Sequence, residues 1–314
     1  MDSVLTAVRA LHFAACIVLF GEYVYAYTVS PDGRPRPRFV GVAGWSLGIA
    51  VVTAAAWLAI EAAHMSGEPL SQALDDGTLE VVLASTLFGH TWVVRAVLAL
   101  VLAVSLVAMH DGGNGARVTP SPALPQGGGR RALAIGAVCA ALLLVSLSCT
   151  GHAAGDAGTK GMAHLCVDGV HLLAAGAWLG ALVPLVSLLR EGSPGSRARA
   201  ALAVRRFSFL GMACVGALVL SGLTNAMFAM NHVSALVDSR YGRELLVKLA
   251  LFAAIVALAA VNRVRLTPRL ESADAPSASV AQRSLLRNAL AEVVLGFAIV
   301  AIVGNLGITM PPMH

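Results

Sequence analysis

Three histidines and an aspartate stand close together at the start of one long apolar run. The stretch 150–180 reads TGHAAGDAGTKGMAHLCVDGVHLLAAGAWLG and holds His152, His164, Asp168 and His171. In a helix the last three are spaced i, i+4 and i+7, which places them on one face. A rise of about 1.5 Å per residue puts His171 roughly 10 Å further along the axis than His164. Because imidazole is the commonest metal ligand, the pattern predicts a metal site.

Imidazole and thioether groups also occur together at the ends of other apolar runs. His64 is followed by Met65, and Met227, Met230 and His232 lie within six residues of one another. Imidazole with thioether suits copper, and soft thioether surroundings favour Cu(I). The predicted copper ligands are His12, His64, His152, His164, His171, His232, Met65, Met227 and Met230. A simpler interpretation stays open, since interfacial histidines snorkel and methionines fill apolar cores.

Three further polar residues are expected to support these ligands. We interpret Asp168 as an ion-pair partner of Arg9, or as a carboxylate that orients His171, because metal-bound histidines usually donate their second N–H to such a group. Asn225 belongs to a polar patch that hydrogen bonding between helices would explain. Glu22 and Glu292 lie in the inner parts of their runs and extend a hypothetical polar route inward.

The elements that position these residues are membrane-spanning helices. The chain of 314 residues is 57% hydrophobic and 12% charged, with a mean hydropathy of +0.77, whereas a soluble domain has about 25% charged residues. A helix needs about 20 apolar residues to cross the hydrocarbon core. We therefore predict an all-α polytopic membrane protein with eight transmembrane helices, at about 4–29, 39–63, 91–109, 132–150, 164–189, 207–230, 243–265 and 288–308. The first run is too long for a cleavable signal peptide and is expected to stay as an anchor.

The basic residues predict the orientation of these helices. Although the net charge is +5, 16 of the 22 Lys and Arg residues fall in one set of short loops, which indicates topology and not a nucleic-acid-binding face. Both termini are therefore expected outside. Seven of the nine histidines then lie at or near the outer face, and His12 lies about a third of the way down the first helix. The acidic segment 64–90 is outside as well, and 110–131 is expected to be a flexible inner linker.

The sequence also contains a weak internal duplication. RALHFAAC (9–16) aligns with DGVHLLAA (168–175), and RFVGVAGWSLG (38–48) with RFSFLGMACVG (206–216). The alignment pairs His12 with His171, His64 with His232, and Arg95 with Lys248. Four helices in each half predict a parallel repeat about an axis along the membrane normal. We therefore expect one transmembrane domain, 1–314, made of a first repeat (1–150) and a second repeat (151–314).

Several segments resemble the copper resistance protein D (CopD) family. They are GHAAGDAGTKGMAHLCVDGVHLLAAGAWLGALVPL (151–185), SGLTNAM (221–227), YGRELLVKLALFAAIVALAAVNRVRLTPRL (241–270) and STLFGHTWVVRAVLAL (85–100). The resemblance implies a multi-pass protein of the bacterial inner membrane, so that the outside predicted for both termini from the basic residues is the periplasm. It implies that copper is received from a separate periplasmic carrier of the CopC type and moved inward. The family's motif positions fall on His152, His164, Asp168, His171 and Asn225.

The leading hypothesis is therefore a copper permease without enzymatic activity. No GxxxxGK[ST] loop for ATP is present, so movement would depend on gradients or on capture inside. One alternative is a haem b protein for transmembrane electron transfer, with His12 and His171 or His64 and His232 as axial ligands. Another is a docking partner of the carrier that transports nothing, with segment 64–90 as its surface.

Overall fold

The chain folds as a bundle of long helices. The computed structural model describes residues 2–30, 35, 38–67, 69–75, 77–115, 127–150, 158–191, 194–229, 235–270 and 275–307. All regular structure in these ranges is helical. Within them, eight helical segments are long and apolar enough to cross a membrane, which confirms the predicted all-α polytopic class and the predicted number of spans.

The first half supplies four of these segments. α1 (Asp2–Val24) continues into a π-helical turn, η1 (Tyr25–Val29), and α2 (Phe39–Ser66) follows. The third and fourth segments are α5 (Leu87–Gly115) and α6 (Gly127–Val145), the latter followed by the short 3-10 turn η2 (Ser148–Thr150).

The second half supplies the other four. One continuous segment consists of α7 (Gly158–Ala175), the π-helical turn η4 (Gly176–Gly180) and α8 (Ala181–Leu189). α9 (Pro194–Ala229) is next, and the four-residue α10 (Ala235–Asp238) leads into α11 (Arg240–Val261), η5 (Asn262–Leu266) and α12 (Thr267–Leu270). α13 (Ala275–Leu306) ends the bundle.

The helices extend beyond the apolar runs that predicted them. α9 begins at Pro194 and α13 at Ala275, more than ten residues before the expected starts at 207 and 288. The added turns carry arginine, which is a good helix former and can hold its charge in the headgroup region. The segment 64–90, expected as a loop, contains α3 (Leu70–Asp75) and α4 (Thr78–Ser85). The expected linker 110–131 is partly helical, because α5 reaches Gly115 and α6 starts at Gly127; residues 116–126 lie outside the described ranges.

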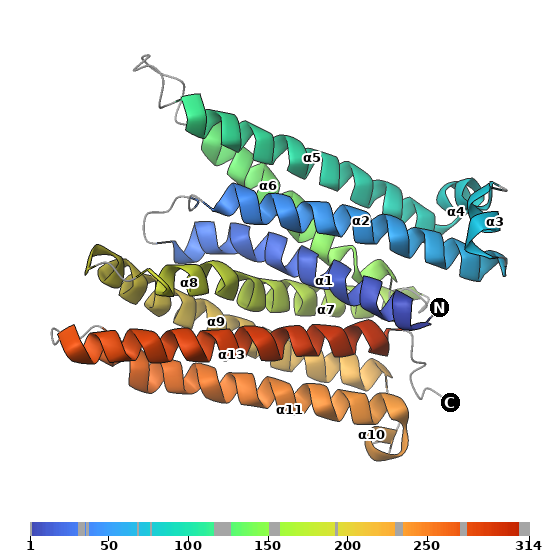
Figure 1. The fold of residues 1–314 in the computed structure, drawn as a ribbon. Helices are drawn as coiled ribbons and strands as arrows, with labels where there is room; N and C mark the ends of the chain where they lie inside the picture. The colour runs from blue at the N-terminus through green and yellow to red at the C-terminus, as the bar shows by residue number, and fades with distance from the viewer. Residues whose placement is uncertain are drawn as a thin grey trace.

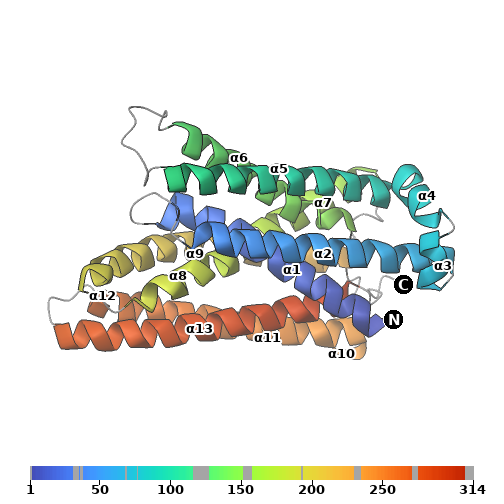
Figure 2. The same cartoon turned by 45° about the horizontal axis from the view of Figure 1, so that its top comes forward.

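Two segments form the centre of the bundle. α1 lies between α2 and α6 on one side and α8 and α13 on the other (Figures 1 and 2). The most apolar window of the α7–α8 segment is 72% buried, whereas that of α11 is only 6% buried. Large apolar side chains such as Trp45 and Leu220 are exposed on the periphery, at 79% and 71%. This distribution suits a surface surrounded by lipid, with the polar residues of α1 and α7 held inside.

The two central segments cross at a pair of glycines. A Cβ atom added to Gly21 would lie 2.1 Å from the Gly180 carbonyl carbon, and one added to Gly180 would lie 2.1 Å from the Ile17 carbonyl oxygen. Only small residues allow helix backbones to approach this closely. Gly21 and Gly180 differ by 159 positions, as do His12 and His171. Each histidine therefore lies nine residues, or about 14 Å along the helix axis, before the crossing.

The start of α1 and the end of α13 lie at the same end of the bundle, together with α3 and α4 (Figure 1). An even number of crossings requires this arrangement. Arg38 at the start of α2 and Arg190 at the end of α8 belong to the opposite end. That both termini lie outside stays a prediction.

Candidate metal-binding site

The polar stripe on α7 faces a matching stripe on α9. The His164 ring stacks on Phe228 with centroids 4.7 Å apart, and Asn225 Nδ2 donates to Asp168 Oδ1 at 3.1 Å. One turn further inward, His171 Nδ1 lies 3.0 Å from Ser221 Oγ. Side-chain contacts therefore join α7 and α9 at successive helical turns. The structure brings together four residues that the sequence singled out: His164, Asp168, His171 and Asn225.

The hydrogen bond to Ser221 determines which nitrogen of His171 is free. The Ser221 hydroxyl donates its only hydrogen to the carbonyl oxygen of Ala217, at 2.6 Å. Its oxygen must then accept from His171, so Nδ1 carries the proton. Nε2 is left with its lone pair, which is the form of imidazole that binds metals. In metal sites, a neighbouring hydrogen-bond partner typically holds the ligand histidine in one tautomer.

His171 lines a cavity of about 360 Å³. The cavity lies among α7, η4, α9, α11 and α13, and most of its lining is apolar. Lys248 of α11 lines it too, and the Lys248 ammonium interacts electrostatically with both His171 and Asp168. Among the described residues that line it, α1 contributes Ile17 and not His12.

The first half builds a similar arrangement around His12, which is 1% exposed. His12 Nδ1 lies 2.9 Å from Thr53 Oγ1 of α2, and Thr53 donates its own hydrogen to the Ile49 carbonyl oxygen at 2.6 Å. By the same reasoning Nδ1 is the donor and Nε2 holds the lone pair. The rings of Trp57 and Trp92 lie 5.8 and 5.9 Å from the imidazole and exclude water from it.

A buried guanidinium stands beside this second imidazole. Arg95 of α5 is 2% exposed, and its Nη2 donates to His12 Nε2. Its Nη1 donates to the Ser146 hydroxyl at 2.5 Å and to the Leu143 carbonyl at 3.3 Å, both on the α6 segment. The guanidinium also lies over Trp92, 4.8 Å from the ring centroid. Each half thus places a cation near its histidine: Arg95 is bonded to His12, and Lys248 interacts electrostatically with His171.

The sequence missed part of this arrangement, although a signal was present. The duplication paired His12 with His171 and Arg95 with Lys248, and in each half the structure places the cation near the histidine. The offset of 168 residues that aligns RFVGVAGWSLG with RFSFLGMACVG also pairs Thr53 with Ser221, the two hydroxyls that hold the histidines. Extending that alignment by five residues would have found both.

Arg9 and Asp168 do not form the ion pair expected of them. Arg9 lies over the Trp57 ring, 4.4 Å from its centroid, and interacts electrostatically with Glu61. Asp168 bonds to Asn225 and interacts with Lys248. The reason is that the face of α1 with Arg9 packs toward α2 and the end of α13, whereas the face of α7 with Asp168 packs toward α9 and α11.

Of the remaining predicted ligands, the structure describes His64, Met65 and Met227. His64 and Met65 end α2 and are exposed, Met65 at 52%, and Met227 on α9 is 73% exposed. His152, Met230 and His232 lie outside the described residues. Among the residues that the structure describes, no three His, Cys, Asp or Glu side chains gather closely enough to hold a metal ion. The copper ligands therefore stay a prediction.

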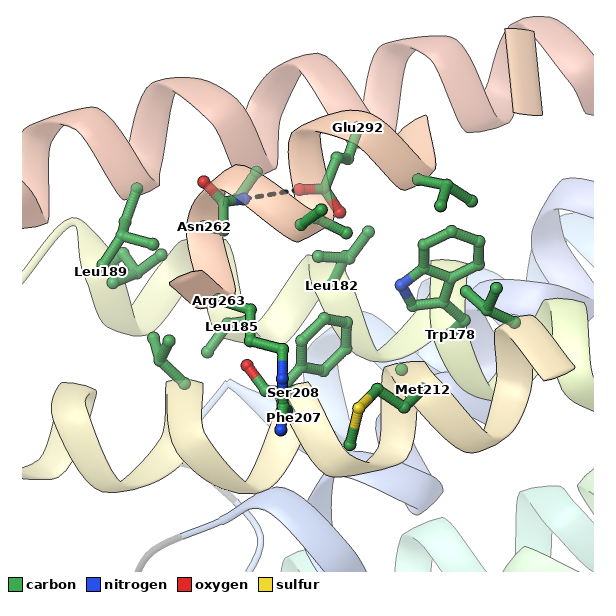
Figure 3. A pocket seen from close by; sticks show the side chains of 18 residues that line it. Trp178, Leu182, Leu185, Leu189, Phe207, Ser208, Met212, Asn262, Arg263 and Glu292 are labelled. Carbon is green, nitrogen blue, oxygen red and sulfur yellow. Dashed lines mark hydrogen bonds between the residues drawn. The ribbon is translucent and has the colours of Figure 1, made fainter. Parts of the chain in front are cut away.

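A second cavity, of about 250 Å³, lies further inward (Figure 3). Glu292 of α13 is 2% exposed and lines both cavities, as does Trp178. Asn262 Nδ2 donates to Glu292 Oε1 at 2.6 Å, and Asn288 Nδ2 donates to Asn262 Oδ1 at 2.7 Å. A buried carboxyl group therefore stands between an outer space with His171 and an inner space with Arg263.

Comparison with known proteins places this geometry in a family. The sequence model for the N-terminal domain of copper resistance protein D-like proteins matches residues 1–162, and the model for copper resistance protein D matches residues 201–306. The chain belongs to the copper resistance protein D family. The resemblance inferred from the sequence segments is thus confirmed, and the first match covers half of the chain.

Three curated CopD-family relatives are similar over different lengths. Copper resistance protein D of Pseudomonas syringae pv. tomato is 34% identical over 176 residues, which are 54% of this chain and 57% of that protein. Inner membrane protein YebZ of Escherichia coli (strain K12) is 28% identical over 271 residues, 84% of each chain. Copper transport protein CutJ of Bacillus subtilis (strain 168) is 30% identical over 212 residues, 65% of this chain and 36% of that protein. The match thus spans a little over half of the Pseudomonas protein.

Proposed function

We propose that this protein imports copper across the bacterial inner membrane, from the periplasm toward the cytoplasm. The observation that supports it most is a pair of histidines inside the bundle, one in each half. Both are held through Nδ1 by a hydroxyl on the next helix, which keeps the metal-binding nitrogen deprotonated. Ionisable groups inside a membrane are costly and usually functional. Family membership, with relatives named for copper resistance and copper transport, supports copper as the cargo.

The orientation that we propose rests on charge. Sixteen of the 22 Lys and Arg residues fall in the loops that the sequence assigns to one side, and Lys and Arg are retained on the cytoplasmic side. The inner membrane is the location named for the E. coli relative. Both termini, α3 and α4 then face the periplasm. The end of the bundle with the start of α1, α3 and α4 is the entrance for copper. The cavity beside Asn262 lies toward the exit.

Copper reaches this entrance from a periplasmic carrier of the CopC type. The exposed His64 and Met65 at the end of α2 offer a first contact, next to the short helices α3 and α4. His152, Met230 and His232 are proposed to complete the outer set of donors. From there the ion passes to His171 along the stripe of α7.

Transport is tested in vesicles that contain the purified full chain and a Cu(I)-specific fluorescent chelator inside. We expect copper-dependent fluorescence with the wild type and its loss in His171→Ala. His110→Ala, at the inner end of α5, is the matched control and should transport normally. Vesicles that accumulate no copper although the protein binds it would contradict import and support a docking role.

The same preparation tests the haem alternative. His12 does not line the cavity of His171, so the two imidazoles do not face one common space as axial ligands of one haem would. We expect copper in the purified protein and no Soret absorption. A Soret band that scales with protein and disappears in His171→Ala would replace the copper proposal with electron transfer.

A further inference from the structure

A buried thiol lies one helical turn inward of His12. Cys16 and His12 are spaced i, i+4 on α1 and are both 1% exposed. Cys16 Sγ lies 3.7 Å from His12 Nε2, the nitrogen that keeps its lone pair. Since that spacing puts both side chains on one helix face, the two atoms point to a common position.

The distance between these atoms suits a shared metal ion. Typical metal–nitrogen and metal–sulfur bonds are about 2.1 and 2.3 Å long. With those lengths, donor atoms 3.7 Å apart subtend an angle of about 115° at the metal. A single ion therefore fits between them without a change in the fold of α1.

A cation already occupies this position in the structure. The Arg95 guanidinium donates to His12 Nε2 and is hydrogen-bonded to Cys16 as well. It is 2% exposed, and its Nε atom has no hydrogen-bond partner among the described residues. The other groups that it contacts are neutral, the Ser146 hydroxyl and the Leu143 carbonyl. These surroundings already hold one positive charge, that of Arg95. Because a buried charge without an anion beside it is costly, a second positive charge is disfavoured unless an anion accompanies it.

The surroundings select the kind of ion. Trp57 and Trp92 enclose His12 and leave few donors besides one nitrogen and one sulfur. Zn²⁺ in proteins requires four ligands, and Ca²⁺ and Mg²⁺ require oxygen. A soft thiolate selects Cu(I) over these harder ions.

We propose that His12 and Cys16 form a Cu(I) site that the metal enters by displacing the Arg95 guanidinium. The proposal rests on the proposed function, because it takes copper to be the cargo. On binding, the S–H bond breaks and its proton is released to water, a sulfur–copper bond forms, and copper stays Cu(I). The ion and the thiolate together are neutral, so Arg95 keeps its charge and stays bonded to Ser146 and Leu143.

The second half lacks this thiol. The residue equivalent to Cys16 at an offset of 159 is Ala175, and the second half carries Asp168 where the first carries Arg9. The soft site therefore exists in the first half alone. The two buried histidines of the repeat are thus chemically different, one with a sulfur neighbour and one with a carboxylate nearby.

X-ray absorption at the copper edge tests the site. The full-length protein in detergent is loaded anaerobically with one equivalent of Cu(I). We expect one short sulfur and at least one nitrogen in the wild type. In Cys16→Ala the short Cu–S scattering should disappear, and the Kd for Cu(I), from competition with a chelator, should rise at least about tenfold. Cys139→Ala on α6 is the control, because Cys139 is also buried, at 8%.

Cys16→Ser keeps the size of the side chain and should behave like Cys16→Ala. A second readout is tryptophan fluorescence, since copper between His12 and Cys16 lies near Trp57 and Trp92 and should quench them. Unchanged Cu–S scattering and quenching in both Cys16 variants would overturn the site, whatever the transport assay gives. Loss of both in a protein that imports no copper would keep the site and contradict the proposed function.

Discussion

The buried histidines show how single residues set up the chemistry. In both halves a hydroxyl donates to a backbone carbonyl of its own helix, and its oxygen accepts a hydrogen bond from Nδ1–H of the histidine. This single hydrogen bond fixes the tautomer. The sequence could predict His12 and His171, because a histidine inside an apolar run is unusual. It could not predict Cys16 as a neighbour, since a single cysteine in such a run normally packs as a small apolar residue.

Ser221→Ala tests the positioning role of the hydroxyl. Without it His171 loses the acceptor for Nδ1, so that the proton can move to Nε2, and we expect copper to bind at His171 about tenfold more weakly. Ser187→Ala is the matched control, because the Ser187 hydroxyl also bonds backward within its helix but contacts no histidine. The measurement is Cu(I) competition in detergent, with the unfolding midpoint recorded for both variants. Equal affinities would show that Ser221 only fills space.

Arg95→Leu tests whether the guanidinium competes with copper. Leucine removes the charge and the hydrogen bond to His12 Nε2 and adds no donor atom for copper. We expect Cu(I) to bind the first half about tenfold more tightly, which equals about 1.4 kcal/mol. The chelator competition is repeated in the Cys16→Ala background, where the gain should vanish. Weaker binding in Arg95→Leu would mean that Arg95 holds the site in shape and does not occupy it.

At the scale of the helices, a glycine crossing fixes the geometry. α1 and η4 touch at Gly21 and Gly180, and this contact sets the distance between the two histidine helices. Apolar runs predict that helices exist, since length and hydropathy suffice for that. They do not predict which helices cross or where, because every face of a lipid-surrounded helix is apolar. The extensions of α9 and α13 were missed for a related reason: their arginine-bearing turns lack the hydropathy that marks a span.

Gly180→Ala is expected to destabilise the protein by at least about 2 kcal/mol, because its Cβ would overlap the backbone of α1. Gly216→Ala on α9 is the control. Its Cβ meets nothing within 4 Å, and alanine is the better helix former, so this variant should be as stable as the wild type or more so. Thermal unfolding in detergent measures both. A Gly180→Ala protein with an unchanged midpoint would show that α1 and η4 do not meet this closely.

The whole molecule combines two similar halves with different chemistry. The parallel repeat stays a prediction, in which His12 pairs with His171, Thr53 with Ser221, and Gly21 with Gly180. The sequence does not predict which helices, far apart in the chain, line a common cavity. The two cavities are lined from η4, α9, α11 and α13 together, and Glu292 joins them across a sequence separation of more than a hundred residues from His171.

Glu292→Gln tests the route through these cavities. A cation that leaves His171 for the inner side crosses a region of low dielectric, where a carboxylate lowers its energy. Glutamine keeps an oxygen for the Asn262 donor and removes the negative charge, so the fold should stay intact. We expect copper uptake into vesicles to slow by at least about tenfold, about 1.4 kcal/mol, while Cu(I) affinity in detergent stays unchanged. Glu191→Gln is the control, since Glu191 pairs with Arg199 at the inner surface, outside both cavities. Equal uptake rates in the two variants would mean that copper crosses by a path that does not pass Glu292.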